Sequence, residues 1–250
     1  METEIYNEIY KLQTEGWWFG NGRNKLVIEL LSDICPSLEK KKILDVGCSE
    51  GAFLDCLKKE KSDFRAIDID KNAIEFCKKR GFKDRVKEGS ILDIPFKDNS
   101  FDIVTALDVV EHVEDDVKAM RELARVAKKG GTVFVILPAH PWLWSKNDEA
   151  YHHHRRYDLD MVKKLVAKTY LRIEAITYFN VLLFPVFVLA TLATKLSASK
   201  GSNVVKPVPR PINSVLSGIM NVERTILKKR LREEPGRLPG SSFIVILKKK

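Results

Sequence analysis

Carboxylates and glycines gather at the ends of two short apolar runs of the sequence. Asp45, Gly47 and Gly51 lie in the stretch DVGCSEG, and Asp68 ends the second run, 23 residues beyond Asp45. Glycines at this spacing permit a tight turn and let a ligand contact bare backbone. A carboxylate at a strand end can accept two hydrogen bonds from ribose hydroxyls. The pattern therefore predicts a binding site for an adenosine-containing ligand.

The glycine loop differs from the two common phosphate-binding patterns. Its spacing is G-x-x-x-G instead of the G-x-G-x-x-G of dinucleotide sites, and no Gly-Lys-Ser/Thr follows it. Asp45 would repel a pyrophosphate, whereas it would attract a cationic amino group. Asp70 stands just before a predicted helix, and we interpret it as the N-cap of that helix. The ligand expected here carries an adenosine and a positive charge.

The histidines are concentrated in one segment. Four of the five lie between residues 140 and 154, and three of them are consecutive at 152–154. Adjacent side chains on an extended chain point in different directions, and no His-x-x-x-His spacing is present. The cysteines at 35, 48, 56 and 77 form no Cys-x-x-Cys pair. The sequence therefore predicts no metal site, and the cysteine pattern points to a reduced, cytosolic setting.

Short apolar runs alternate with helical patterns along most of the chain. Such alternation is typical of βαβ units and a mostly parallel sheet, which binds ligands beyond the carboxyl ends of its strands. A turn is expected at Gly20-Asn21-Gly22, and Gly130-Gly131 is expected to end a helix. The predicted strands are 42–46, 64–69, 85–88, 101–107, 132–137, 171–179 and 242–247, and the predicted helices are 1–35 with a break at the turn, 51–59, 71–80, 115–127 and 159–167.

The composition is that of a globular protein with a basic tail. Of the 250 residues, 44% are hydrophobic and 31% are charged, which excludes a collagen-like fibre or a disordered chain. The polar, acidic start METEIYNEIY predicts no secretory signal peptide. Residues 195–250 contain 13 Lys and Arg against 3 Asp and Glu, whereas the whole chain has 43 against 34. The excess of positive charge is therefore concentrated in the tail.

The basic tail suggests an anionic partner: a membrane surface, a nucleic acid or an acidic ligand, unless the charge only increases solubility. Its lack of interleaved aromatic residues argues against nucleic acid. Residues 175–194, just before it, carry no charge but include Asn180 and Pro185, which disfavours a membrane-spanning helix. We expect a buried or membrane-facing helix over 181–196 and peripheral contact of 181–250 with an anionic membrane.

Residues 43–53, ILDVGCSEGAF, resemble the first motif of class I S-adenosylmethionine-dependent methyltransferases, and the resemblance continues through 66–81 and 88–138. Within that family the chain is similar to the type 11 group. The resemblance implies a Rossmann-like, seven-stranded α/β sheet, mostly parallel, with helices on both faces and an antiparallel last strand. The expected organisation is a helical cap over 1–40, a cofactor domain over 41–180 with 241–250, and an apolar and basic helical insertion over 181–240.

The resemblance also implies that S-adenosylmethionine is the cofactor. It places Asp45, Gly47 and Gly51 on the methionine side of the site. Asp68 would hold the ribose, and Ile69 would pack on the adenine.

Two positions depart from the family pattern. Ser49 stands where the family often has glycine, and Ser90 stands where it often has an aspartate that meets the adenine amino group. Ser90 can still accept a hydrogen bond, or the backbone of Ile91 can serve. The cofactor-binding residues expected from the resemblance are completed by Cys48, Ser49, Ser90, Ile91 and Leu107.

The aromatic cluster Trp17-Trp18-Phe19 near the start of the chain has two interpretations. Large aromatic side chains in a helical segment are typical of core packing. Together with Arg23, the cluster could instead cover the cofactor.

The segment after the fifth predicted strand resembles a narrower subgroup of these methyltransferases with the pattern PxxxWLWSxxDExxxHxRRY. The match places His153, Arg155, Arg156 and Tyr157 on the subgroup's positions. A loop here overhangs the carboxyl ends of the strands and can form an acceptor pocket, to which we also assign His140. Arg155 and Arg156 could grip a carboxylate or phosphate, or Arg156 could form a salt bridge with Asp148 that shapes the loop.

These features predict an enzyme that transfers a methyl group in line from S-adenosylmethionine to a small-molecule, lipid-linked or glycan-linked acceptor. An oxygen or nitrogen acceptor also needs a base, and the candidates, in order, are His153, His112 and Tyr157. His112 belongs to a Glu111-His112 pair that the family places at the transfer site. The alternative is a non-catalytic cofactor-binding or membrane-docked scaffold of the same fold. We expect a cytoplasmic location, with peripheral contact at the inner face of the membrane.

Overall fold

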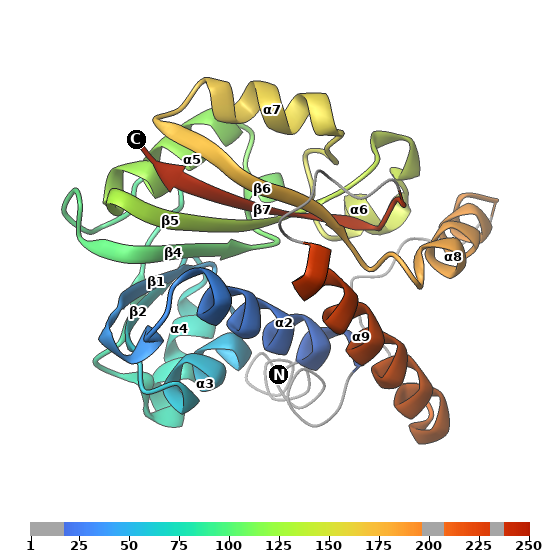
Figure 1. Cartoon of the computed structure of the whole chain (residues 1–250), viewed down its shortest axis with the longest axis horizontal. Coiled ribbons are helices and arrows are strands. Elements are labelled where there is room, and N and C mark those ends of the chain that lie inside the picture. The colour runs from blue at the N-terminus through green and yellow to red at the C-terminus, as the bar shows by residue number, and fades with distance from the viewer. Residues whose placement is uncertain (1–17, 197–207, 231–237) are drawn as a thin grey trace.

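A seven-stranded sheet forms the centre of the computed structural model, which describes residues 18–196, 208–230 and 238–250 (Figure 1). The strand order is β3-β2-β1-β4-β5-β7-β6. The strands are β1 (Lys42–Val46), β2 (Asp63–Asp68), β3 (Val86–Glu88), β4 (Phe101–Leu107), β5 (Ala127–Pro138), β6 (Leu171–Phe179) and β7 (Ser242–Lys249).

The strand directions confirm the predicted fold class. Neighbouring strands from β3 to β5 are parallel, whereas β7 lies antiparallel between β5 and β6. Val46 at the end of β1 lies opposite Ile67 of β2 and Ala106 of β4. The chain first builds β1, β2 and β3 toward one edge and then β4 and β5 toward the other. The strand order therefore reverses between β1 and β4, and the carboxyl ends of β1, β2 and β4 meet there.

Side chains of the strands alternate between two hydrophobic layers, one on each face of the sheet. One layer packs on α5 and α7 and the other on α2, α3, α4 and α9, as Figure 1 shows above and below the sheet. The helices are α2 (Trp18–Ile34), α3 (Ala52–Lys59), α4 (Lys71–Cys77), α5 (Asp116–Val126), α6 (Lys146–Ala150), α7 (Leu159–Ala167), α8 (Phe184–Leu196) and α9 (Arg210–Arg230), with the short turns η1 (Leu38–Lys40), η2 (Lys78–Phe82), η3 (Val110–His112) and η4 (Pro141–Leu143).

The glycine pair Gly130-Gly131 lies inside β5, so the prediction that it ends a helix was wrong. Helix α5 ends at Val126, and β5 begins at the next residue. The pairing of β4 with β5 jumps from Phe101–Ala127 to Ile103–Thr132, which leaves extra residues of β5 between the two pairs. Gly130 has a φ of 71°. The glycines therefore let the strand bulge, a use of glycine that sequence spacing does not distinguish from a helix stop.

The turn expected at Gly20-Asn21-Gly22 is also wrong, because α2 runs without a break from Trp18 to Ile34. Gly22 faces α9, and a Cβ on it would lie 3.2 Å from Cε of Met220. The glycine therefore serves close helix packing. Residues 1–17, which include Trp17 and the first part of the cap expected over 1–40, lie outside the described residues.

The segment after β6 forms α8 and α9, and α8 begins at Phe184 instead of the predicted position 181. Helix α9 packs along α2, where Arg224 pairs with Glu29 at 3.1 Å. Glu223 is buried, and its carboxylate accepts the backbone amide of Val181 at 2.8 Å. Within 18–196, 208–230 and 238–250, no helix is both long and apolar enough to cross a membrane.

Candidate functional site

The loop after β1 turns sharply at the point where the strand order reverses. Gly47 and Gly51 have φ angles of 78° and 80°, which strongly favour glycine. A Cβ on Gly47 would lie 2.5 Å from Cγ2 of Val109, and the Gly47 amide donates to the carbonyl of Ile67 at 2.8 Å. The loop is therefore fitted closely between β2 and the segment after β4. The tight turn predicted from the glycines is present.

Asp68 joins this loop to the end of β2. One carboxylate oxygen accepts the Ser49 amide at 2.8 Å and the other accepts the Asp70 amide at 2.9 Å. Burial raises the pKa of Asp68. The next residue, Ile69, has 73% of its surface exposed, so an apolar side chain stands unburied at the strand end. Asp70 accepts the Asn72 amide at 2.8 Å, which confirms its interpretation as an N-cap.

Asp45 lies almost fully buried near the end of β1. Its carboxylate accepts a hydrogen bond from the Thr105 hydroxyl of β4 at 2.7 Å. Burial is the largest influence and raises the pKa of Asp45 to about 7, although Thr105 and the positive charge of Arg23 act in the opposite direction. A cationic ligand beside Asp45 would favour its ionised form.

Arg23 reaches this region from α2. Its guanidinium donates to Asp108 at 2.5 Å, directly after β4, where Asp108 has a φ of 58°. The neighbouring aromatic residues pack instead: the Phe19 ring lies 5.5 Å from Trp18 and 5.8 Å from Phe179 of β6. Of the two interpretations of the aromatic cluster, the structure supports core packing for Trp18 and Phe19, while Arg23 lies at the site. Sequence reasoning missed both Asp108 and Thr105, because neither belongs to a local pattern.

The remaining predicted cofactor residues lie around the same loop but are largely buried. Ser90 uses its hydroxyl to accept the Leu92 amide at 3.1 Å, which holds its own turn. Ile91, Cys48 and Leu107 are buried. Their side chains pack in the two hydrophobic layers of the core, so contact with a ligand would fall to backbone atoms.

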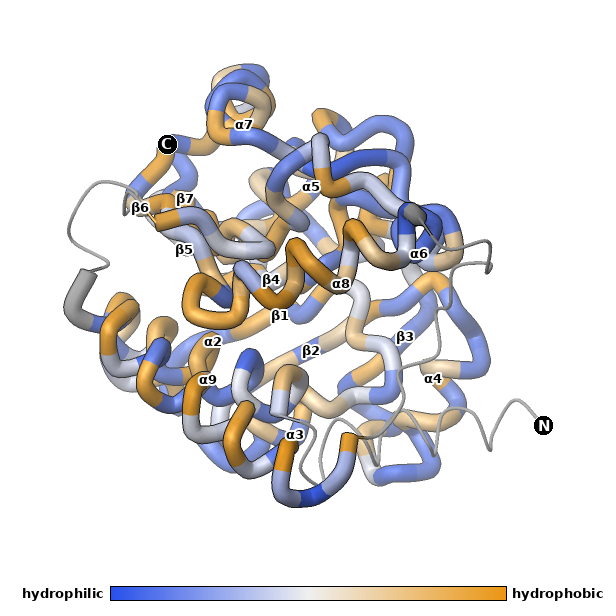
Figure 2. Tube along the Cα trace, turned by 90° about the vertical axis from the view of Figure 1, so that its right-hand side faces the viewer, coloured by the Kyte–Doolittle hydropathy of each residue, from blue (hydrophilic) through white to orange (hydrophobic). Residues whose placement is uncertain are grey.

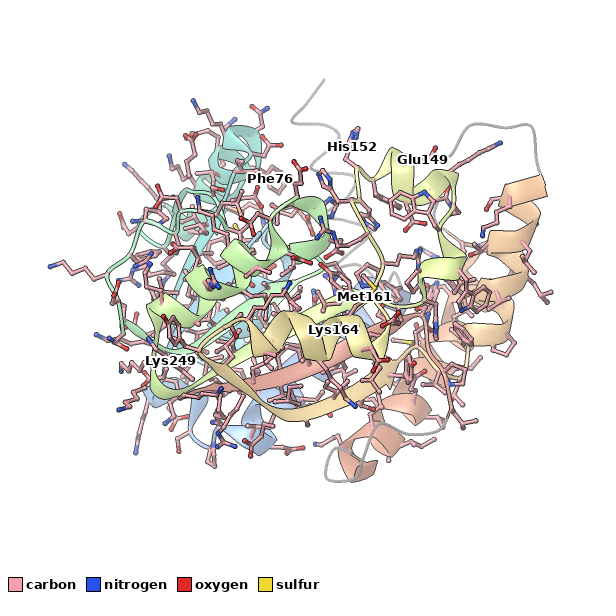
Figure 3. The ribbon with its side chains drawn as sticks, turned by 90° about the horizontal axis from the view of Figure 1, so that it is seen from above. Phe76, Glu149, His152, Met161, Lys164 and Lys249 are labelled. Atoms are coloured by element: carbon pink, nitrogen blue, oxygen red, sulfur yellow. The ribbon has the colours of Figure 1, made fainter. Side chains whose placement is uncertain are left out.

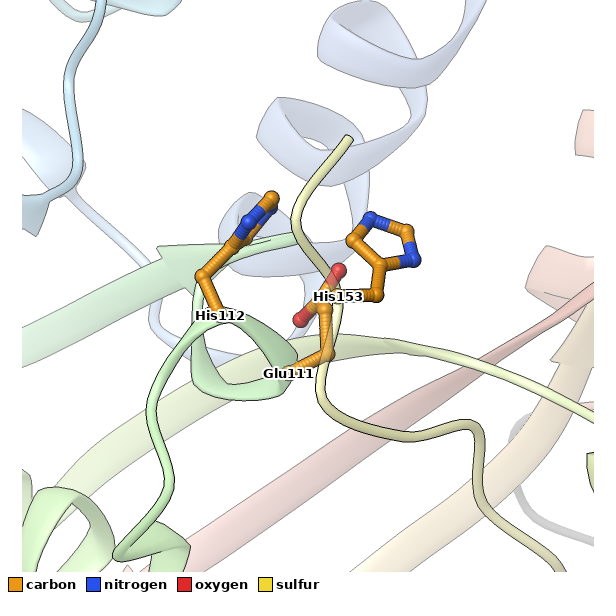
Figure 4. Close-up of side chains that lie close together, drawn as sticks. All are labelled: Glu111, His112 and His153. Carbon is orange, nitrogen blue, oxygen red and sulfur yellow. The ribbon is translucent and has the colours of Figure 1, made fainter. Parts of the chain in front are cut away.

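His112 and His153 come together although 41 positions separate them in the chain (Figure 4). Their ring centroids lie 4.7 Å apart, and the buried Glu111 lies against both. Glu111 and His112 belong to η3, just after β4, and His153 comes from the loop after α6. The flanking His152 is exposed and projects at the outer edge of this loop near Glu149 (Figure 3). Of the three consecutive histidines, His153 is the one whose side chain contacts Glu111 and His112.

The two arginines after this histidine form ion pairs within the protein. Arg156 is buried and contacts Asp148 at 2.7 Å, which is the salt bridge that the second interpretation expected. Arg155 contacts Asp116 at 2.9 Å and the carbonyl of Glu114 at 2.6 Å. Both guanidiniums therefore hold the loop against the body of the protein.

Tyr157 and His140 lie in packed surroundings. Tyr157 is 1% exposed, its hydroxyl lies 3.2 Å from Asp116, and burial raises its pKa strongly, which favours a packing role over that of a base. The His140 ring stacks on Tyr178 at 5.4 Å and lies 5.0 Å from Phe184 of α8. Burial lowers the pKa of His140, so its ring is favoured in the neutral form.

A Rossmann-like sheet with an antiparallel last strand, a glycine loop after β1 and carboxylates near the ends of β1 and β2 defines the class I methyltransferase fold. Residues 44–135 match the family described as "Methyltransferase domain". This part of the chain is similar to the S-adenosylmethionine-dependent methyltransferases of class I.

Individual relatives cover part of the chain. An uncharacterized protein of Methanocaldococcus jannaschii is 36% identical over 120 residues, which are 47% of this chain and 51% of that protein. A probable S-adenosylmethionine-dependent methyltransferase of Mycobacterium tuberculosis is 29% identical over 127 residues, 51% of this chain and 44% of that one. The chain thus spans about half the length of these curated relatives.

The fold is also shared with solved structures. The geranyl diphosphate C-methyltransferase of Streptomyces coelicolor A3(2), solved with Mg²⁺, geranyl-S-thiolodiphosphate and S-adenosyl-L-homocysteine, superposes with a TM-score of 0.59. The match covers 90% of this chain and 75% of that one at 15% identity, so the likeness concerns the fold.

Proposed function

We propose that this protein transfers a methyl group from S-adenosylmethionine to an acceptor. The observation that carries the proposal is the placement of Asp45 and Asp68 on either side of the glycine loop, at the reversal point of the sheet. Asp68 would bind the ribose hydroxyls, and the exposed Ile69 would pack on the adenine. Asp45 would attract the ammonium group of the methionine moiety, and the bare backbone at Gly47 would let the cofactor approach closely.

The chemistry asks little of the protein beyond positioning. The sulfonium is already an activated methyl donor, so no covalent nucleophile is needed. The acceptor atom must lie about 3 Å from the methyl carbon and in line with the S–C bond. As the new bond forms, the S–C electron pair returns to sulfur, which becomes a neutral thioether, and an O–H or N–H acceptor gives up its proton.

We place the acceptor over the carboxyl ends of β4 and β5, where η3 and the loop after α6 meet. His112 and His153 lie there, in contact with each other, whereas Tyr157 is enclosed in the core. The acceptor is a small molecule or a lipid-linked or glycan-linked group. Arg155 and Arg156 would assist an anionic acceptor only by exchanging their present ion pairs with Asp116 and Asp148.

Transfer of labelled methyl from S-adenosylmethionine into an extract of the source cells tests this function. Label that enters the organic phase would support a lipid-linked acceptor, and label in the aqueous phase would support a small or glycan-linked one. If the protein binds the cofactor but no fraction is labelled, the enzyme assignment fails and the non-catalytic scaffold replaces it.

Cofactor affinity is expected to depend on pH through Asp45. The pKa of Asp45 in the free protein is raised to about 7, and a bound cation would lower it by favouring the carboxylate. Binding would then release a proton, so affinity should fall by up to about tenfold per pH unit as the pH drops below 7. Calorimetric titration with S-adenosylmethionine between about pH 5.5 and about pH 7.5, a range that extends about 1.5 units below that pKa, measures the slope.

The Asp45→Asn variant is the control for this prediction. It keeps the size of the side chain and an oxygen that can accept from Thr105. Its affinity should be weak at all these pH values and nearly flat. A variant that keeps the slope of the wild type would show that another group titrates.

We further propose that α8 contacts an anionic membrane surface peripherally. Figure 2 shows α8 as a hydrophobic segment on the face of the protein that is turned toward the viewer. Lys195 at its end donates to the carbonyl of Trp142 at 2.7 Å, which ties the helix to the acceptor side of the protein. A lipid-linked acceptor could thus be reached from the membrane. The exposed apolar side chains of this surface are Leu182, Val186, Leu189 and Leu192.

A substitution on α8 should weaken vesicle binding. Leu189 is 68% exposed, and replacing it with glutamate puts a charge where the helix would enter the lipid interface. We expect co-sedimentation with vesicles that contain anionic lipid to fall at least about fivefold, with no loss of cofactor binding. Tyr170→Glu, at a residue that is 70% exposed far from α8 in sequence, is the matched control and should bind vesicles like the wild type. Equal binding by Leu189→Glu and the wild type would contradict the proposal.

A further inference from the structure

Three side chains with metal-binding atoms converge beside the proposed acceptor site. Glu111, His112 and His153 each offer one ligand atom, and these atoms all lie within 4.8 Å of one another (Figure 4). Glu111 and His112 are fixed by η3 immediately after β4, while His153 approaches from a different loop. In the close-up the Glu111 carboxylate lies between the two imidazole rings. A single ion could therefore be reached by all three.

The Glu111 carboxylate lacks a full set of partners. The residue is 1% exposed, and among the described residues none forms a hydrogen bond to its Oε2 atom. A buried carboxylate without a partner is costly unless a cation or a proton neutralises it. Arg156, the closest buried guanidinium of this loop, is already engaged by Asp148. The unpaired oxygen thus marks a place for a positive charge.

The histidines are oriented as metal ligands usually are. Nδ1 of His153 lies 3.1 Å from Oδ1 of Asp148, which leaves Nε2 free to bind an ion. Asp148 itself is fixed by Arg156 at 2.7 Å and by the Ser145 amide at 2.9 Å. A carboxylate behind a histidine fixes the tautomer and makes the other nitrogen a better ligand.

His112 has a comparable neighbour. The backbone of Tyr151 lies within hydrogen-bonding reach of its ring. A ligating histidine almost always uses its second nitrogen for such a bond to a backbone carbonyl or a carboxylate. His153 therefore has one ring nitrogen engaged by Asp148 and the other available to an ion, and the Tyr151 backbone can hold the His112 ring in the same way.

We propose that Glu111, His112 and His153 form a binding site for a divalent transition-metal ion. Two imidazoles and one carboxylate suit ions such as Zn²⁺, Co²⁺ or Fe²⁺ and leave further coordination positions open. The two histidines are then ligands and do not act as bases. The site would exist whatever reaction the protein performs.

One consequence rests on the proposed function. An ion with open positions at the carboxyl end of β4 would bind an oxygen atom of the acceptor. Coordination lowers the pKa of a bound hydroxyl group, so the oxygen would lose its proton more readily before it attacks the methyl carbon. This favours an acceptor that presents a hydroxyl oxygen to the ion.

Cobalt binding to the full chain tests the site without any substrate. The protein, free of any histidine tag and treated with chelator, is titrated with Co²⁺, whose visible spectrum reports nitrogen and oxygen ligands. We expect one ion per chain, displaced by Zn²⁺, and a thermal transition that rises with Co²⁺ concentration. Binding of less than one equivalent, or a spectrum of the hydrated ion only, would overturn the proposal.

Two variants and a neighbouring control locate the ion. Glu111→Gln and His153→Ala should each lower Co²⁺ affinity at least about 10-fold to 100-fold, the range seen even for residues behind the ligands. His154→Ala, at the exposed neighbour of His153, should bind Co²⁺ like the wild type. Binding that survives in both ligand variants, or that is lost equally in the control, places the ion elsewhere and overturns the assignment.

The same preparations separate this proposal from the methyl-transfer function. Co²⁺ binding with no affinity for S-adenosylmethionine would leave the metal site standing and remove the proposed function. The opposite result is also possible to recognise. If Co²⁺ does not bind, and the chelator changes neither cofactor binding nor methyl transfer, the metal site is wrong and the proposed function stands.

Discussion

Replacing Asp68 with alanine is expected to lower the affinity for S-adenosylmethionine about 100-fold or more. The carboxylate would accept hydrogen bonds from the ribose hydroxyls, and a hydrogen bond to a charged group contributes about 1.5–3 kcal/mol. It also accepts the amides of Ser49 and Asp70, so its loss loosens the glycine loop as well. Calorimetric titration with S-adenosylmethionine and with S-adenosylhomocysteine measures the change.

The neighbouring carboxylate provides the control. Asp70 caps α4 through the Asn72 amide and has no assigned role in ligand binding. Asp70→Ala should reduce the free energy of unfolding by about 1 kcal/mol and leave the cofactor affinity within about twofold of the wild type. If the cofactor affinities of Asp68→Ala and Asp70→Ala are equal, the assignment of Asp68 to the ribose is wrong.

Gly47→Ala should both destabilise the protein and abolish tight cofactor binding. The added Cβ would lie 2.5 Å from Cγ2 of Val109, and the φ of 78° is strained for any residue with a side chain. Overpacking costs about 1–3 kcal/mol and the left-handed conformation about 1–2 kcal/mol. We therefore expect the free energy of unfolding in urea to fall by about 2–5 kcal/mol, with the loop displaced from its binding geometry.

Gly81→Ala is the control that separates the cost of the backbone conformation from the cost of the contact with a neighbouring side chain. Gly81 of η2 has a φ of 91°, but a Cβ there would meet no atom within 4 Å. Only the conformational cost of about 1–2 kcal/mol should appear, and cofactor affinity should not change. If Gly47→Ala and Gly81→Ala lose the same stability, then Val109 moves away from the added Cβ at no cost. That result would contradict the close fit of the loop against Val109.

Most of the fold follows from local patterns in the sequence. The apolar runs that became β1, β2 and β4 are short, bounded by polar residues and buried on both faces, so their periodicity alone indicates parallel strands. Two errors concern glycines. Gly22 faces Met220 of α9, and Gly130 allows a bulge within β5. A single sequence shows that a glycine is present but not the structural role that it has.

Some residues of the candidate site could be predicted from local sequence patterns and others could not. Asp45 and Asp68 could be identified because each ends a strand beside a glycine loop, a local signal. The convergence of His153 with Glu111 and His112 could not, because it depends on the path of the loop after α6. Spacing within the histidine run does not show that a histidine of the run meets side chains from another loop. The burial of Tyr157 was missed for a related reason, since its neighbours in the core come from distant strands and helices.

Hydrogen exchange of backbone amides with and without S-adenosylhomocysteine tests the central claim most directly. If the cofactor binds at the reversal point of the sheet, slower exchange should appear in the glycine loop 47–51, at the end of β2 over 68–70 and in the turn 89–92. Helix α7, Leu159–Ala167, packs on β6 at the far edge of the sheet and should exchange as before. No protection at a saturating ligand concentration, or protection confined to segments outside these three, would contradict the account.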